Sequence, residues 1–405
     1  MEHRILAGLS LMAVLVGGCG SSDDNNDTST DSGADTAAET SSGGSAGTGG
    51  GGTGGSAGTG GSAGTGGGET GGSAGTGGGE SGGSAGTGGS GGVGGTGGSG
   101  IVEGTSCEGL AKACGKDGNT SCCSGLLVPG GAFPMGRSEN GTDKCPTGTA
   151  CSRDEQPEHE VTVSDFYLNE FKVTVGRFRK FVEKYEEAGT KPKAGAGAHP
   201  KIPGSGWQAE WDSELPTSQA ELISRLKCRE DFQTWRDTVG DTEQHPINCV
   251  NWFEAFAFCA WDGGRLPTEA EWEKAAAGGD ENRLYPWGQA EPDATRAAYS
   301  CDYDGKSGCT FADIAKVGML PAGQGRWGHK DLAGNLLEWV FDGYDSHWYS
   351  KVGNTCVDCA KLPIMSLWVL RGSDFNAPSS RSAARLFTLP TQRNVFRGFR
   401  CARTK

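Results

Sequence analysis

Cysteines are the residues of this chain whose type and spacing could carry the most chemistry. The sequence has 15 of them, and setting Cys19 aside leaves 14, spread from Cys107 to Cys401. Thiolates act as nucleophiles, soft-metal ligands or disulfide partners, and an even number in an exported protein indicates a disulfide framework. We therefore expect these 14 cysteines to pair as up to seven disulfides. Two local pairs fit this framework: Cys145 with Cys151, and Cys301 with Cys309.

Two clusters of cysteines allow a second interpretation. Cys356 and Cys359 form a C-x-x-C pair, but no thioredoxin-like βαβ pattern surrounds them, so a static loop staple is favoured over a redox site. Zinc is the alternative to disulfides for an earlier group, made of Cys107, Cys114, Cys122 and Cys123. Their spacing lacks paired C-x-x-C knuckles, so the sequence favours a stapled collar.

Histidine, the other common metal ligand, shows no ligand spacing here. The histidines after residue 100 are His159, His199, His245, His329 and His347. None forms H-x-x-H or H-E-x-x-H, and we expect His159 to be a hydrogen-bonding core residue. His329 lies beside an acidic loop and is the best histidine candidate for a functional role. A net charge of −14 and a pI near 5.0 exclude a basic nucleic-acid surface, so no nucleic-acid partner is expected.

Residues 1–19 have the pattern of a bacterial export signal. The apolar run from Ile5 to Val16 is too short for a permanent membrane span. It leads into Val16-Gly17-Gly18-Cys19, which resembles the lipobox of bacterial lipoproteins and implies lipidation of Cys19. An ordinary cleaved signal peptide is the alternative. Because Gly20 follows, the resemblance favours an outer-membrane lipoprotein of the cell envelope, held to the membrane by its lipid.

Residues 20–105 are expected to form a disordered, glycine-rich linker. The unit Ser-Ala-Gly-Thr-Gly-Gly occurs five times, and no aromatic residue lies between Gly20 and Gly100. Such a segment has nothing from which to build a core. The cysteine-rich collar then covers 106–125, and the main domain 126–405.

The main domain mixes short strands, few helices and many turns. Glu160–Val163 and Phe166–Leu168 alternate like strands, and Val175–Glu187 has apolar residues at helical spacing. Thr268 and Glu271 form a capping box that begins a second helix. Residues 189–220 lack periodicity and are expected to be a surface insertion.

Motifs in order across 126–403 resemble the formylglycine-generating enzyme, or sulfatase-modifying factor, family. They are Leu127–Gly136, Asp154–Val161, Pro246–Trp252, Gly264–Glu273, Tyr285–Gly288, Asp331–Val340, Arg371–Ser373 and Gly398–Cys401. The resemblance implies an irregular α+β fold related to C-type lectins, with little regular secondary structure, after the disordered linker. It also implies a disulfide between Cys259 and Cys401. Both positions of a second family disulfide lack cysteine, at Ala276 and Ser382.

The family's oxidase chemistry implies two cysteines that bind copper(I) just after the turn at Arg371–Ser373. No cysteine occurs between Cys359 and Cys401, and a soft ion such as copper(I) requires thiolates. Copper is therefore not expected, no catalytic residue is assigned, and the sequence favours a protein without the family's activity.

The resemblance also implies a structural calcium ion in the loop from residue 331 to residue 338. Asp331 and Glu338 would supply carboxylates, and Gly334 and Leu336 backbone carbonyls. Hard oxygen ligands from one tight loop suit calcium. Solvated or arginine-paired acids are the alternative.

Two functions remain open. One is a binding module, with a lectin-like groove for an unknown peptide, glycan or protein ligand. The expected groove residues are Asp374, Asn376, Arg381, Arg385 and His329. The other is a tailoring oxidoreductase of the wider superfamily, which includes sulfoxide synthases and pyoverdine-maturation proteins, with a different active site. The missing thiols favour the binding module.

Overall fold

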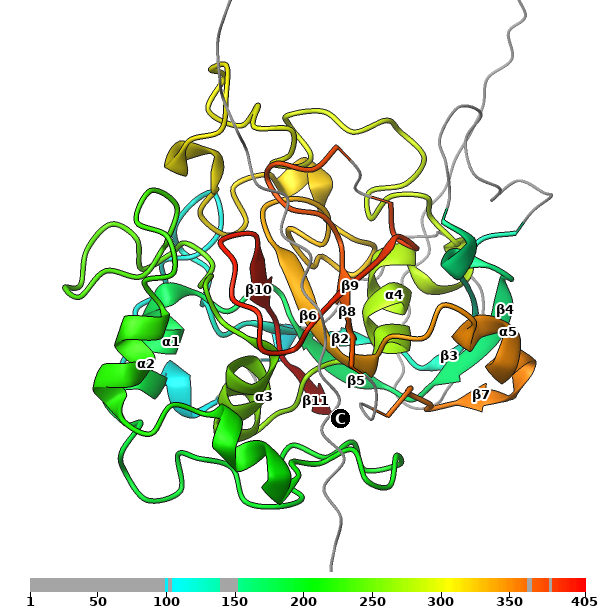
Figure 1. Ribbon diagram of the computed structural model, residues 1–405. Coiled ribbons are helices and arrows are strands. Elements are labelled where there is room, and N and C mark those ends of the chain that lie inside the picture. Colours follow the sequence, from blue (N-terminus) through cyan, green and yellow to red (C-terminus); the bar gives the residue numbers. More distant parts are fainter. Residues whose placement is uncertain (1–98, 101–103, 139–151, 363–365, 379–380) are drawn as a thin grey trace, which may run out of the picture. The chain divides into compact units, whose positions relative to one another are not determined.

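Three small β-sheets position the rest of the fold. The computed structural model describes residues 99–100, 104–138, 152–362, 366–378 and 381–405 (Figure 1). The first sheet has the order β1-β2-β5-β11, with strands Ser99–Gly100, Gly125–Val128, Phe166–Asn169 and Ala402–Thr404. The second has the order β10-β6-β8-β9, with strands Arg397–Phe399, Leu337–Gly343, Trp368–Arg371 and Arg385–Thr388. The third has the order β3-β4-β7, with strands Gly131–Met135, His159–Val163 and Cys356–Val357.

Short helices pack around these sheets. The α-helices are α1 (Val175–Glu183), α2 (Gln219–Arg225), α3 (Trp252–Trp261), α4 (Glu269–Ala277) and α5 (Trp348–Val352). The 3-10 helices are η1 (Thr105–Cys107), η2 (Arg153–Glu155), η3 (Ala209–Glu214), η4 (Gly279–Glu281), η5 (Phe311–Asp313), η6 (Pro321–Gly323) and η7 (Gly353–Thr355). Among the described residues, no helix is both long and apolar enough to cross a bilayer. The mixed architecture with little regular structure agrees with the expected α+β class.

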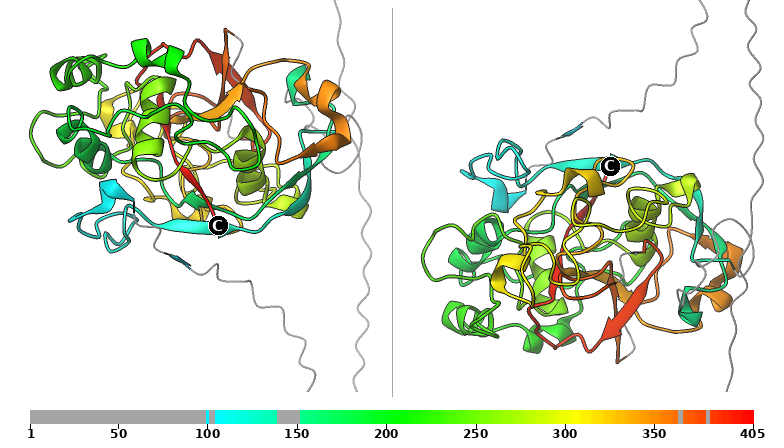
Figure 2. Two further views of the ribbon diagram at one scale, coloured as in Figure 1. Left: turned by 90° about the horizontal axis from the view of Figure 1, so that it is seen from below. Right: turned by 90° about the horizontal axis from the view of Figure 1, so that it is seen from above.

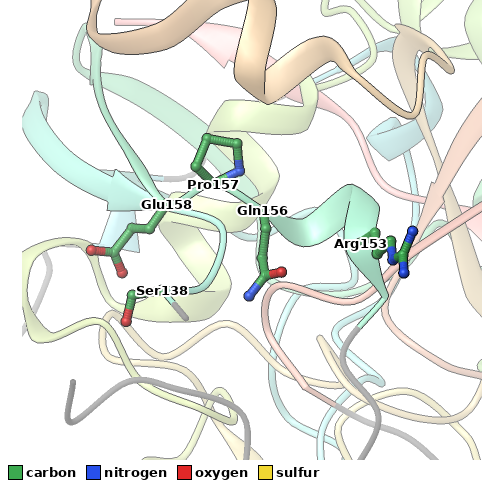
Figure 3. Close-up of a pocket in the computed structure, with 5 residues that line it drawn as sticks. All are labelled: Ser138, Arg153, Gln156, Pro157 and Glu158. Carbon is green, nitrogen blue, oxygen red and sulfur yellow. The ribbon is translucent and has the colours of Figure 1, made fainter. Parts of the chain in front are cut away.

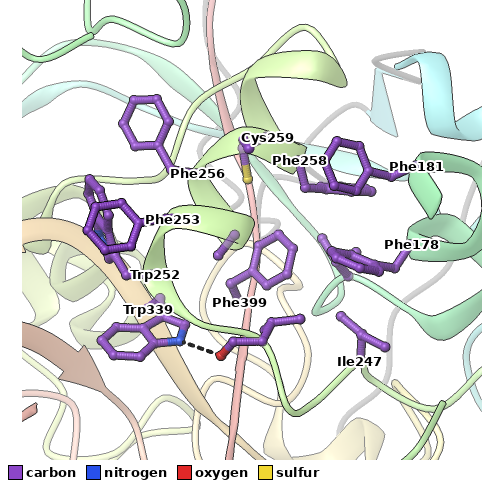
Figure 4. Close-up of a cluster of buried hydrophobic side chains, with 14 of the residues drawn as sticks. Phe178, Phe181, Ile247, Trp252, Phe253, Phe256, Phe258, Cys259, Trp339 and Phe399 are labelled. Carbon is purple, nitrogen blue, oxygen red and sulfur yellow. Dashed lines mark hydrogen bonds between the residues drawn. The ribbon is translucent and has the colours of Figure 1, made fainter. Parts of the chain in front are cut away.

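The largest hydrophobic cluster joins α1, α3 and the second sheet (Figure 4). Phe178 of α1 stacks on Phe258 of α3 at a ring distance of 5.4 Å, and Phe258 in turn meets Phe399 edge-on at 5.4 Å. Trp339 of β6 is buried below them and donates its indole N–H to the Val250 carbonyl at 3.2 Å. The aromatic rings therefore lock two helices to the sheet by apolar burial.

The structure confirms the strands and the start of α4 that the local sequence predicts. Both strands expected before residue 170 are present, as β4 and β5. The predicted capping box is also present, because the Thr268 hydroxyl accepts from the Glu271 backbone N–H at 3.2 Å and the Glu271 carboxylate accepts from the Thr268 N–H at 2.9 Å. The expected helix Val175–Glu187 is shorter in the structure, since α1 ends at Glu183.

The expected surface insertion, residues 189–220, is exposed over much of its length but is anchored in the core by a few buried side chains. Trp207 is 1% exposed and Leu215 is 3% exposed, both within the largest cluster. His199 is buried with its Nε2 at 3.6 Å from the Glu271 carboxylate of α4. The segment is therefore an irregular and largely exposed stretch, and its lack of periodicity did not reveal the buried anchors.

Disulfides tie distant segments together. The bonds between described cysteines are Cys107–Cys123, Cys114–Cys122, Cys228–Cys249, Cys259–Cys401, Cys301–Cys309 and Cys356–Cys359. The collar is thus cross-linked by two nested bridges, and the two cysteines of the C-x-x-C pair are bonded to each other. Cys19, Cys145, Cys151, the export signal and most of the linker lie outside the described residues.

Removing the Cys259–Cys401 bond should destabilise the domain strongly. The bond spans 142 residues, and loop-closure entropy predicts a loss of about 5 kcal/mol in the free energy of unfolding for the double serine variant. Denaturant unfolding followed by tryptophan fluorescence measures this loss. The Cys356–Cys359 bond spans only 3 residues, so its double serine variant is the matched control, with an expected loss of about 2 kcal/mol. Equal losses for the two variants would contradict the prediction.

Candidate functional site

Glu338 of β6 is a buried hub for positive charge. Its Oε1 accepts from Lys172 Nζ at 2.5 Å and from Arg400 Nη2 at 2.8 Å. Its Oε2 accepts from Arg400 Nε at 2.7 Å and from Trp272 Nε1 at 3.0 Å. Burial raises the pKa of Glu338, but the Arg400 and Lys172 charges override this effect and lower it to about 2. Both carboxylate oxygens are therefore fully used by the protein itself.

The expected calcium loop is organised by Lys172 instead. The Lys172 ammonium donates to the Asp331 carbonyl at 2.7 Å as well as to Glu338, so it bridges two of the expected metal ligands. The Asp331 carboxylate accepts from the Gly318 N–H at 2.7 Å. Lys172 and Arg400 already balance the two carboxylates, so a divalent ion would add uncompensated charge to a closed, buried space.

The set Asp331, Gly334, Leu336 and Glu338 therefore does not fit a calcium ion in this structure, because Lys172 and Arg400 already bind its carboxylate and carbonyl oxygens. Within the described ranges, no group of three or more histidine, cysteine, aspartate or glutamate side chains could hold a metal ion. The sequence signal that was missed is Lys172 itself, a single charged residue between the core residues Phe171 and Val173.

A second buried charge network surrounds the turn at Arg371–Ser373. Arg371 of β8 pairs with Glu269 at 3.0 Å and with Glu273 at 2.6 Å, both on α4. Arg385 of β9 binds the same Glu269 carboxylate through two nitrogens, at 2.7 and 2.9 Å. The Tyr349 hydroxyl lies 3.4 Å from Glu269 and 3.3 Å from Glu273. The network joins α4, α5, β8 and β9 and is internally paired.

The expected groove residues do not come together as a ligand surface. Asp374 accepts from the backbone N–H groups of Asn376 and Ala377, at 2.8 and 3.1 Å. Arg381 is 5% exposed and pairs with a glutamate of η2, and Arg385 is held by α4. His329 is fully buried, and this burial lowers its pKa to about 3, which keeps it neutral. Only Asn376 of the five is exposed.

No free thiol lies beside this turn in the described part of the chain. Every described cysteine belongs to a disulfide. The Cys301–Cys309 bridge does come close, because Cys309 Sγ lies 3.1 Å from Asn376 Oδ1. Sequence reasoning predicted the bridge but not its position beside the turn.

A polar hollow opens beside η2 and the residues that follow it (Figure 3). It has a volume of about 710 Å³ and is lined by Ser138, Arg153, Gln156, Pro157 and Glu158. A neighbouring hollow of about 480 Å³ shares Glu158 with it and includes His159. His159 Nδ1 lies 3.1 Å from the Pro157 carbonyl, and burial lowers the pKa of this histidine.

Taken together, the irregular α+β fold, the Cys259–Cys401 bond and the turn at Arg371–Ser373 with its buried charge network define the class of protein. The description "Sulfatase-modifying factor enzyme 1-like domain" matches residues 111–405. The chain belongs to this family. Its sequence motifs for the family are thereby confirmed.

Relatives in this family carry different names and activities. The chain is 32% identical over 248 residues to an inactive C-alpha-formylglycine-generating enzyme 2 of Bos taurus, covering 56% of this chain and 74% of that protein. It is 30% identical to a formylglycine-generating enzyme of Streptomyces coelicolor, covering 68% of this chain and 88% of that protein. It is 29% identical to a hercynine oxygenase of Mycolicibacterium smegmatis, covering 68% of this chain and 60% of that protein. Among solved structures, PvdO from Pseudomonas aeruginosa matches at 23% identity and a TM-score of 0.49, covering 70% of this chain and 94% of that one.

Chelation should leave the stability of this protein unchanged, because a lysine takes the place of the ion. We expect the same thermal midpoint in excess EDTA and in millimolar calcium, measured by differential scanning fluorimetry. Lys172→Ala should cost about 3 kcal/mol or more, because it breaks a buried pair. Lys306→Ala, at an exposed lysine, is the control and should have little effect. A midpoint that falls in EDTA would show that the loop needs a metal ion.

Proposed function

We propose that this chain is an envelope-anchored lipoprotein that displays its family domain as a binding module for a peptide, glycan or protein. In this proposal the domain lacks formylglycine-generating oxidase activity. One observation carries the proposal: the turn after Arg371 has no cysteine, and the described cysteines are all consumed in disulfides. A soft-metal oxidase centre of the kind that the family resemblance implies would require a thiolate pair there.

The buried arginines support the same conclusion. Arg371 and Arg385 are positioned near the family's active-site turn, but both are neutralised by Glu269, and Arg371 also by Glu273. Such charge-paired, buried side chains stabilise the fold and bring no uncompensated positive charge to a reacting group. Similarity to an inactive C-alpha-formylglycine-generating enzyme 2 of Bos taurus supports the same proposal.

The alternative is a tailoring oxidoreductase with a different active site. Similarity to a hercynine oxygenase is the observation in its favour. The binding proposal is preferred because the described residues offer no cluster for a metal ion and no free thiol.

An oxidation assay tests the proposal. The purified, disulfide-intact protein is incubated with oxygen, copper(I) and a sulfatase-type Cys-x-Pro-x-Arg peptide, and the peptide mass is measured. We expect an unchanged peptide, while an active formylglycine-generating enzyme run in parallel converts the cysteine to an aldehyde. Aldehyde formation by this chain would refute the proposal, and stoichiometric iron or copper retained through purification would favour the oxidoreductase.

The lipid anchor is tested at Cys19. In a bacterial host, the wild-type protein should partition with membranes and show an N-terminal mass increased by a diacylglycerol and an acyl group. Cys19→Ser should release the protein to the soluble fraction. Ser10→Cys, outside the lipobox, should not rescue the anchoring when combined with Cys19→Ser. Membrane retention of Cys19→Ser would contradict lipidation at this residue.

A further inference from the structure

Strand β9 forms an open edge of the second sheet. It is last in the order β10-β6-β8-β9 and pairs with β8 alone, in register from Arg385↔Arg371 to Thr388↔Trp368. In an antiparallel pair, alternate residues direct their backbone N–H and C=O groups away from the neighbouring strand. Those groups of β9 therefore face outward and can accept another strand.

Apolar side chains are exposed along the same edge. Leu386 is 42% exposed, Phe387 is 48% exposed and Leu389, just after β9, is 44% exposed. Leu386 and Phe387 are adjacent in a strand, so they point to opposite faces of the sheet. Their cross-strand neighbours on β8, Leu370 and Val369, are buried.

This pattern indicates what kind of surface would cover the edge. A partner that packed on one face of the sheet would cover either Leu386 or Phe387, and the other residue would stay exposed. An added strand lies beside both residues and covers both faces at once. The exposure on both sides therefore favours an extended polypeptide over a globular face.

The edge is also held in position before any partner binds. Phe387 stacks on Tyr344 at a ring distance of 3.9 Å, and Tyr344 donates its hydroxyl to Asp154 at 2.8 Å. Arg385 at the start of β9 is fixed to Glu269 of α4. Edge strands are usually protected by lysine, proline or a bulge, whereas β9 reads Arg-Leu-Phe-Thr with its one charge turned inward.

The β9 edge lies on the side of the domain away from the end of the linker. In Figure 2, β9 (red-orange) lies on the opposite side of the folded unit from β2 (cyan) and the C-terminus. β1, where the linker sequence ends, pairs with β2. The edge is thus turned away from the side on which the chain enters the domain.

We propose that the β9 edge binds an extended segment of a partner polypeptide by strand addition, through backbone hydrogen bonds and apolar side chains on alternate positions. This inference rests on the proposed binding function and names its ligand class and surface. It requires a ligand strand of about four residues to match β9, Arg385–Thr388.

The experiment selects binders from a displayed library of random dodecapeptides against the full, disulfide-intact chain. Selected peptides are then measured by fluorescence anisotropy against the wild type, Leu386→Lys, Phe387→Lys and the control Val239→Lys, which changes an exposed apolar residue outside the sheets (73% exposed). We expect each β9 variant to weaken binding about tenfold or more, whereas the control binds like the wild type. Thermal midpoints confirm that the variants are folded.

A backbone test uses the wild-type protein alone. Methylating the amide nitrogens of alternate peptide residues should abolish binding for one set of positions and leave it nearly intact for the other set, as strand pairing requires. Peptides that bind all variants equally, or tolerate both methylation sets, would overturn the β9 proposal while leaving a binding function elsewhere. Failure to select any peptide would overturn the proposal too. So would a dimer of the wild type, seen by sedimentation velocity, that Leu386→Lys and Phe387→Lys convert to a monomer. The oxidase assay separately tests the other part of the proposed function, the absence of oxidase activity.

Discussion

The requirement that every buried charge be neutralised within the protein shapes this domain. Its helices and strands are short, so loops must be fixed by contacts between segments far apart in sequence. Glu338 joins Lys172 and Arg400 in this way, and Glu269 joins Arg371 to Arg385. Each carboxylate connects two segments, and removing any member would leave a charge without compensation in a low-dielectric interior. The ion pairs thus act as specific connectors where regular secondary structure is sparse.

The same connectors explain how the family fold can form without cysteines after the turn at Arg371–Ser373. Arg371 and Arg385 are anchored by α4 through Glu269, and Cys259 is bonded to Cys401. None of these contacts depends on thiols after the turn at Arg371–Ser373. The scaffold can therefore keep its shape without cysteines in the segment after that turn.

Sequence reasoning succeeded where the signal is local or repeated across the family. The Thr268 and Glu271 capping box depends on residues three apart, and the motifs placed the domain in its family. It failed for Lys172, whose partner Glu338 lies 166 residues away, and for Trp207, whose burial depends on packing against α3. The groove prediction failed for the same reason, because the pairing of Arg381 with η2 spans 226 residues. Such long-range pairings leave no mark in the spacing of nearby residues.

The nested collar disulfides have a mechanical consequence. Tension applied to the chain ahead of the collar passes from Cys107 directly to Cys123 through a covalent bond, so the intervening residues bear little of it. The load then enters β2, which is sandwiched between β1 and β5 and must be sheared from the sheet before it can unravel. The collar would therefore transmit a pulling force into the first sheet without unfolding the residues between Cys107 and Cys123.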